Sequence, residues 1–236
     1  MKRILAILLT LVFAVQADAA VTQHWKLDDN AASTTVVATV GTNGTLVGGD
    51  NTSVKRTTGP GGSIPFAFLF NGTDDAVDIS GASLSRTSGQ AASYSLWFKC
   101  STTASSENSI GVDGSAVRIG PGSDTTIVVR DTSATRTFTV AALGTTWHHL
   151  LVVITTGDAC SVYVDGVASV TNPLTLSGTF APNRLSRGAA YSDISLAQVK
   201  IFDSNESANV AALYAEGVTT ASGKATRAHL SRMMGR

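Results

Sequence analysis

The sequence predicts an all-β protein, an antiparallel β-sandwich with one short C-terminal helix. Short runs of alternating apolar and polar residues recur along the chain, and Gly, Asp, Asn and Pro clusters separate them. Regularly spaced short strands of this kind are typical of sandwiches. Helical spacing is clear only over Ser207–Glu216, where Val210, Leu213 and Tyr214 recur before Gly217, a candidate C-cap.

Thr146–Val170 is the most informative stretch, and it reads as three antiparallel strands. Leu150–Ile154 is a nearly continuous apolar run, and β-forming residues resume at Val162–Val164. Asp165-Gly166 then predicts a two-residue hairpin turn, because such a turn needs positive φ at both positions, which Gly accepts freely and Asp tolerates.

Aromatic residues support further strands. The phenylalanines at positions 66–70 alternate, which predicts one strand face carrying all of them into the core. In Tyr94–Cys100, Leu96 and Phe98 share one face and Trp97 lies on the other.

Turn residues predict where the chain leaves these strands. We expect loops over Lys55–Pro65, which contains Gly-Pro-Gly-Gly, and over Ser80–Ala92. A turn at Gly120–Ser123 is expected to separate strands at Val117–Ile119 and Thr126–Val129. A further strand is expected at residues 137–140.

The N-terminus has the layout of a secretory signal peptide. Lys2-Arg3 precedes the apolar run Ile4–Val15, and Ala17-Asp18-Ala19 matches an A-x-A cleavage site. The apolar run is short for a membrane span, so cleavage is favoured over a retained anchor. We therefore expect residues 1–20 to be removed, residues 21–217 to form one domain, and the protein to be secreted, in a periplasmic or extracellular location.

Composition excludes some partner classes. The formal net charge is zero, and basic residues are scattered except in the tail, so no basic stripe for nucleic acid is present. No membrane insertion is expected after signal cleavage. The basic tail, residues 218–236, has two interpretations that stay open: a solvated terminus, or a segment that docks on an acidic partner. The oligomeric state is not determined by these patterns.

Two cysteines, Cys100 and Cys160, are present in a chain expected in an oxidising compartment. A disulfide is one possibility. The strand assignment argues against it, because both strands would flank Leu150–Ile154 and run parallel, with Cys100 ending one and Cys160 beginning the other. The two residues would then lie at opposite ends, beyond the roughly 5.5–6 Å between Cα atoms that a bridge requires.

The order of several motifs resembles that of the laminin-G-like, concanavalin A-like jelly roll domains. The similarity covers about Val21 to Gly217, and the joint order of the blocks carries more weight than any single one. The matching blocks are His24–Asp28, Phe70–Ile79, Tyr94–Lys99, Trp147-His148 with Tyr163–Gly166, Ala197–Phe202 and Asn209–Gly217.

The resemblance implies a concanavalin A-like jelly roll and a candidate calcium site. Relatives of this fold often bind calcium through a rim loop that here contains Asn71, Asp74 and Asp75, and hard oxygen ligands suit that ion. The alternative is a simple turn in which Asp side chains bond their own backbone. Arg184–Ala190 and Ala197-Gln198 lack the acidic ligands that calcium-dependent relatives supply.

The same resemblance implies a binding function, with carbohydrate or glycoprotein at a cell surface or in matrix as the partner. Tyr191 is the candidate ligand-binding residue, as a stacking platform in a loop, whereas Trp25, Trp97 and Trp147 are expected in the core. The alternative is a structural or assembly protein that binds another protein through a sheet face or through the basic tail.

Catalysis is not expected. Glycoside hydrolysis needs two carboxyl groups at defined separation, and hydrolases of this fold carry them on one strand. Here the glutamates are Glu107, Glu206 and Glu216, none of them mid-strand. His148 and His149 are adjacent in a strand, so they point to opposite faces and do not easily bind one metal ion.

Overall fold

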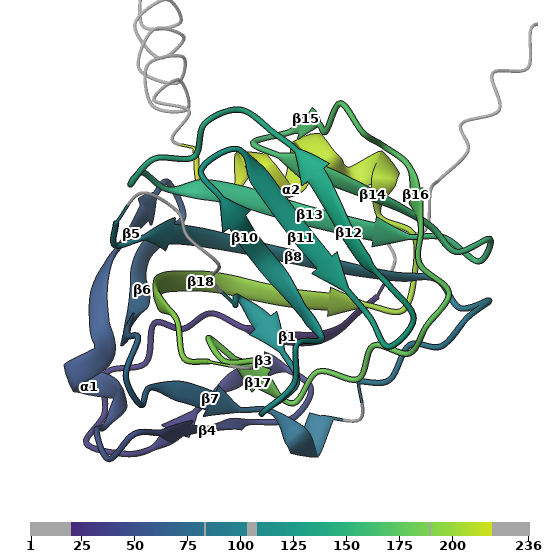
Figure 1. The fold of residues 1–236 in the computed structure, drawn as a ribbon. Coiled ribbons are helices and arrows are strands. Elements are labelled where there is room, and N and C mark those ends of the chain that lie inside the picture. The colour runs from purple at the N-terminus through teal and green to yellow at the C-terminus, as the bar shows by residue number, and fades with distance from the viewer. Residues whose placement is uncertain (1–19, 83, 103–107, 189, 219–236) are drawn as a thin grey trace, which may run out of the picture.

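The structure is a computed structural model that describes residues 20–82, 84–102, 108–188 and 190–218 (Figure 1). The expected signal peptide and basic tail lie almost wholly outside these residues, and so does Glu107. Within the described residues, no helix is long and apolar enough to span a bilayer.

Two sheets lie face to face, as the sequence predicts. In Figure 1, β10, β11 and β12 cross in front of β8, β13 and β18. The first sheet comprises β15 (Val167–Ala168), β14 (Ala159–Val164), β13 (His148–Ile154), β8 (Ala92–Cys100), β18 (Asp193–Phe202), β1 (Val21–Trp25) and β3 (Ala38–Val40), with β16 (Leu174–Thr175) paired to β14, β6 (Ile64–Asn71) to β18, and β5 (Arg56–Gly61) to β6. The second comprises β12 (Thr135–Thr139), β11 (Thr126–Arg130), β10 (Arg118–Ser123), β9 (Ile110–Gly111), β17 (Arg184–Leu185), β7 (Ala76–Asp78), β4 (Gly44–Val47) and β2 (Thr35–Val36). The helices are α1 (Thr52–Lys55), α2 (Val210–Ala215) and the 3-10 turns η1 (Ser80–Ala82) and η2 (Ser207–Asn209).

The hairpin strands predicted around Thr146–Val170 are confirmed as β13, β14 and β15. Antiparallel pairing places Leu150 opposite both Val164 and Leu96, so β13 lies between β14 and β8. Asp165 has φ 53° and Gly166 has φ 79°, which is the positive-φ pair that the Asp-Gly turn requires.

Strand β18 is a central strand of the first sheet and pairs with three other strands. Its first half pairs with β6 and its second half with β1, while β8 lies along the other side. The register shifts between Ala197 and Lys200, where Gln198 has φ 50° and donates its backbone N–H to Lys26 O. This bulge re-aims the strand where its neighbour changes.

Two of the expected loops are strands. Arg56–Gly61 forms β5, so the chain turns only at Gly62-Ser63, between the paired residues Gly61 and Ile64; Gly62 has φ 59°. Gly120–Ser123 belongs to β10, in which Pro121 pairs with Ile127 just before a register shift. Proline lacks an N–H for the ladder and is tolerated at such a bulge, which is why its presence was a poor turn signal.

The core lies between the two sheets and consists of side chains from the inner face of each. Leu96 and Phe98 lie in it, and Trp97 lies on the outer face with Ala197, as the alternation predicts. Trp25 is fully buried, whereas Trp147 is only partly buried. Phe66 contradicts its prediction: it is 36% exposed, and the Arg56 guanidinium covers its ring at 3.3 Å from the centroid.

Cys100 and Cys160 are both buried and are not bridged to each other. Cys160 lies opposite Ile154, which lies opposite Ala92 at the far end of β8 from Cys100. The distance along β8 from Ala92 to Cys100 is about 26 Å, so the sequence argument against a disulfide holds.

The predicted C-terminal helix is η2 followed by α2, which packs on the outer face of the first sheet. Tyr214 stacks on Trp97 at 5.8 Å between ring centroids. Gly217 does not take the positive φ of a C-cap. Its role is close approach, because a Cβ there would lie 2.3 Å from the Trp97 ring.

Candidate functional site

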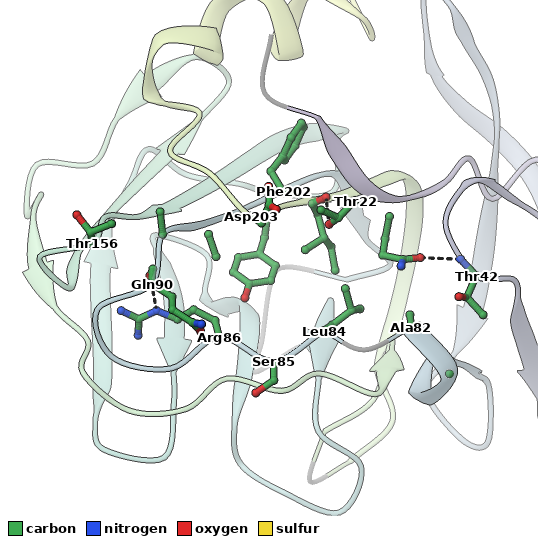
Figure 2. A pocket seen from close by; sticks show the side chains of 16 residues that line it. Thr22, Thr42, Ala82, Leu84, Ser85, Arg86, Gln90, Thr156, Phe202 and Asp203 are labelled. Atoms are coloured by element: carbon green, nitrogen blue, oxygen red, sulfur yellow. Dashed lines mark hydrogen bonds between the residues drawn. The ribbon is translucent and has the colours of Figure 1, made fainter. Parts of the chain in front are cut away.

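A pocket of about 550 Å³ lies at the end of the sandwich where β8 begins and β18 ends. Its lining comes from segments far apart in sequence: the start of β1, Thr42, residues 81–82, 84–86 and 90–92, Tyr94, Thr156, and the end of β18 with the residue after it (Figure 2). We call it the end pocket. Its volume lies within the range of small-molecule sites.

The segment expected to be a simple loop, Ser80–Ala92, forms one wall of the end pocket and is held by Arg86. This side chain is 3% exposed. Its Nε donates to Gln90 O at 3.1 Å, its Nη1 donates to Leu176 O and Gly178 O at 2.9 and 3.1 Å, and its Nη2 pairs with the Asp158 carboxylate. The guanidinium thus ties three segments of the chain together around one buried charge, two through backbone oxygens and one through the Asp158 carboxylate.

Tyr94, near the start of β8, combines an apolar ring with a hydroxyl that lacks a protein partner. Its ring packs edge to face on Phe180 at 5.1 Å, and the residue is 2% exposed. Burial raises the pKa of the phenol, which therefore stays protonated. Tyr94 lines the end pocket, and within the described residues its hydroxyl forms no hydrogen bond. Unlike the fully buried polar atoms of the described chain that lack a partner, this hydroxyl keeps solvent access, so it is available for a hydrogen bond to water or to a ligand in the end pocket.

The remaining lining is mixed. Leu84, Ile201 and Phe202 provide apolar surface, and the Gln23 and Gln90 side chains provide amides. Each amide oxygen accepts a backbone N–H at 2.9 Å, from Thr42 and Thr87. For neither amide nitrogen does the described part of the chain supply a hydrogen-bond acceptor. The pocket therefore offers donors, hydroxyls and apolar surface, the combination that small polar ligands require.

The residues predicted as a calcium site form a hydrogen-bonded turn. Asn71 Oδ1 accepts the backbone N–H groups of Thr73 and Asp74 at 2.9 and 3.2 Å, and Asn71 Nδ2 donates to Asp74 Oδ1 at 2.8 Å. Asp75 is fully buried, and its Oδ2 accepts from Asn71 N at 3.0 Å.

A cation already contacts this turn. Lys55 Nζ lies 2.6 Å from Asp75 Oδ2 and 2.5 Å from Asp50 Oδ2. Burial of the ammonium opposes its charge, but the hydrogen bonds to Asp50 and Asp75 outweigh burial and raise the pKa of Lys55. In the described ranges no three His, Cys, Asp or Glu side chains gather as a metal-binding group. Lys55 thus supplies a cation beside Asp75 Oδ2, whereas Asp75 Oδ1 is buried without a hydrogen-bond partner. Calcium binding stays a prediction for titration.

Tyr191 is half-buried, and its ring is covered by a neighbour. The Arg187 guanidinium lies 4.2 Å from the ring centroid and donates to the Tyr191 hydroxyl. Arg187 also pairs with Asp113 at 2.8 Å. One face of the Tyr191 ring is therefore occupied. Stacking of a sugar on Tyr191 stays a prediction, and it would require the other ring face or the displacement of Arg187.

The predicted site residues and the end pocket lie at opposite ends of β18. Asn71 pairs with Asp193, which follows Tyr191 by two positions, so the structure brings these candidates to the beginning of the strand. The end pocket contains Ile201 and Phe202, at its end. The ten residues of β18 separate the two regions by about 30 Å.

The two adjacent histidines point to opposite faces, as predicted. His148 Nδ1 lies 2.7 Å from Asp165 Oδ2, and this hydrogen bond raises the pKa of His148. His149 is 1% exposed on the outer face, where Nε2 lies 2.9 Å from Ser95 Oγ. Burial lowers the pKa of His149 to about 4. Both imidazoles are therefore held in structural contacts.

His149 predicts a loss of stability in mild acid. The unfolded histidine binds a proton near pH 6.5, whereas the folded one stays neutral to about pH 4. Between these values the unfolded state binds more protons, so stability falls as pH falls, by up to about 3 kcal/mol at pH 4. His148 acts oppositely: its stabilising contribution is complete below about pH 6.5 and is lost as pH rises through its raised pKa.

Thermal unfolding at pH 7 and pH 4.5 measures this effect. We expect His149→Gln to lose less stability than the natural protein between these pH values, and His148→Gln to lose more. An equal loss in all three proteins would contradict the assignment.

The described glutamates serve structural contacts. Glu206 is 1% exposed, and its carboxylate accepts hydrogen bonds from Ser204 Oγ and Asn209 Nδ2, both at 2.7 Å. Glu216 pairs with Lys200 at 2.6 Å. Neither lines the end pocket.

Comparisons with solved structures agree with this architecture. The Trypanosoma rangeli sialidase in complex with 2,3-difluorosialic acid superposes with a TM-score of 0.52 at 11% identity, over 82% of this chain and 32% of the sialidase. The botulinum neurotoxin serotype G binding domain superposes with a TM-score of 0.55 at 10% identity, over 83% of this chain and 50% of that domain. Domain 4 of AbnA, an extracellular arabinanase from Geobacillus stearothermophilus, was solved in complex with arabinotriose. It superposes with a TM-score of 0.53 at 17% identity, over 83% of this chain and 98% of that domain.

At these identities the similarity shows the fold alone. The chain spans about a third of the sialidase and half of the neurotoxin domain. No curated protein matches the sequence. A family model described as the Concanavalin A-like lectin/glucanases superfamily, of laminin-G type, matches residues 71–211, more than half of the chain. The chain therefore belongs to the concanavalin A-like lectin/glucanases superfamily.

Proposed function

We propose that this protein is an exported, non-catalytic module that binds carbohydrate, or the glycan of a glycoprotein, through the end pocket. The observation that carries the proposal is the Tyr94 hydroxyl, which is protonated, accessible at the pocket and without a partner in the described chain, together with the unpaired amide nitrogens of Gln23 and Gln90. Sugar hydroxyl groups both donate and accept hydrogen bonds, so they complement such a set.

The fold gives further support. One solved structure of similar fold is a domain in complex with arabinotriose, and the neurotoxin domain is named as a binding domain. Fold similarity alone does not assign a ligand. Export rests on the signal-peptide pattern of residues 1–20.

The test begins with a glycan and polysaccharide array probed with residues 21–236. For any glycan that binds, we expect Tyr94→Phe to weaken affinity about three- to tenfold, because one hydrogen bond to the ligand is lost. The melting temperature should stay the same or rise, since the hydroxyl has no partner to lose in the described chain. Ala91→Trp, which fills the end pocket, should abolish binding.

Tyr191→Phe is the matched control, because it removes the same atom at the other end of β18. If the end pocket is the site, this variant binds as the natural protein does. Loss of binding in Tyr191→Phe with retention in Tyr94→Phe would move the site to the loop that contains Tyr191.

A further inference from the structure

The end pocket contains one cationic side chain, and it is fully committed. Among the described lining residues, Arg86 is the one with a positively charged side chain. Every nitrogen of its guanidinium has an acceptor in Gln90, Leu176, Gly178 or Asp158. The paired Asp158 balances its charge. An anionic ligand would therefore find no available counter-ion in the described lining.

The end pocket also contains one carboxylate, that of Asp203, which forms no ion pair or hydrogen bond within the described residues. Asp203 follows directly after β18 and is exposed at the pocket, close to Phe202 and Thr22 in Figure 2. Since Arg86 and Asp158 cancel, the charge that a ligand meets is that of Asp203.

We infer that the end pocket selects neutral saccharides and rejects acidic ones, with Asp203 as the specificity-determining residue. The inference rests on the proposed function and names its ligand class. A carboxylate entering the pocket loses hydration without gaining a cation, and it meets a like charge. A neutral sugar meets neither penalty, and its hydroxyl groups can donate to the Asp203 carboxylate.

A preference for cationic ligands is a separate possibility that the geometry does not favour. Asp203 is exposed, and a solvent-exposed ion pair contributes little to affinity. The same exposure limits its repulsion of anions, so the lack of a free cation in the lining and the charge of Asp203 each account for about half of the expected discrimination, and mutation and salt can remove only the part due to Asp203.

The experiment compares neutral hexose oligosaccharides with the same oligosaccharides oxidised at the primary hydroxyl to uronates. Calorimetric titration of the natural protein should give at least about tenfold weaker affinity for the uronates. Asp203→Asn should narrow this difference in affinity to about threefold, while Asp203→Glu should preserve it. High salt should narrow the difference in the natural protein but not in Asp203→Asn.

The outcomes separate this inference from the proposed function. Equal or tighter binding of uronates by the natural protein would overturn the inference and leave carbohydrate binding intact. An unchanged ratio in Asp203→Asn would remove Asp203 as the determinant. Binding of neither series by the natural protein would reject the proposed function, and the inference with it.

Discussion

Replacing Arg86 with methionine is expected to lower the free energy of unfolding by about 2–4 kcal/mol, because carbonyl oxygens bound by this buried guanidinium are left without donors. The affected acceptors are Gln90 O, Leu176 O, Gly178 O and the Asp158 carboxylate. Urea unfolding of both proteins measures the change. We expect glycan affinity to fall as well, since the wall formed by residues 81–92 loses its anchor.

Arg86→Lys is the informative control. A lysine keeps the charge and the ion pair with Asp158, but its compact ammonium cannot reach acceptors spread around a planar fork. We expect it to recover less than half of the lost stability. Full recovery would show that charge alone, and not the bridging of three segments of the chain, makes Arg86 important.

Replacing Lys55 with methionine is expected to cost about 3–5 kcal/mol, because it leaves the fully buried Asp75 without its cation. For a domain of this size the melting temperature should fall by about 10 °C. Calorimetry measures the shift. The double variant Lys55→Met/Asp75→Asn should recover part of the loss, because it removes the uncompensated charge.

The same variants examine the calcium prediction. If the Lys55 ammonium serves as the cation of this loop, calcium should not change the melting temperature of the natural protein. A calcium-dependent rise that is absent in Asp75→Asn would instead support a metal site formed by Asn71, Asp74 and Asp75.

Local patterns predicted the strands well because they depend on neighbours in sequence. The Asp165-Gly166 turn and the opposite faces of Leu96 and Trp97 follow from backbone geometry and strand periodicity, and the structure has both. The separation of Cys100 and Cys160 followed from strand order derived in the same way. Such features do not require knowledge of distant contacts.

The end pocket could not be predicted in this way, because its lining comes from separate segments. Thr22, Arg86, Thr156 and Asp203 meet only when β1, β8, β13 and β18 align their ends. Strand periodicity could predict only the direction of Tyr94: it lies two residues before Leu96 and therefore points to the same inner face of β8. Nothing local, however, indicated that its hydroxyl would lack a partner.

The predicted site residues came from the family resemblance and from their positions in loops, and neither specifies their long-range contacts. Asp75 is a predicted calcium ligand, and the structure places Lys55, twenty positions earlier, beside its carboxylate. Tyr191 resembled an open platform, but Arg187 covers one face of its ring. In both cases the decisive neighbour is a basic side chain whose direction the sequence pattern does not specify.

The most direct test of the end pocket is an amide chemical-shift titration of nitrogen-labelled protein with a neutral oligosaccharide identified on the array. Our account predicts that the largest shifts cluster at Gln23, Leu84, Thr156 and Asp203, and that they vanish in Ala91→Trp. Shifts confined to the region of Tyr191 and the loop after β6 would contradict it and place the ligand at the other end of the sandwich.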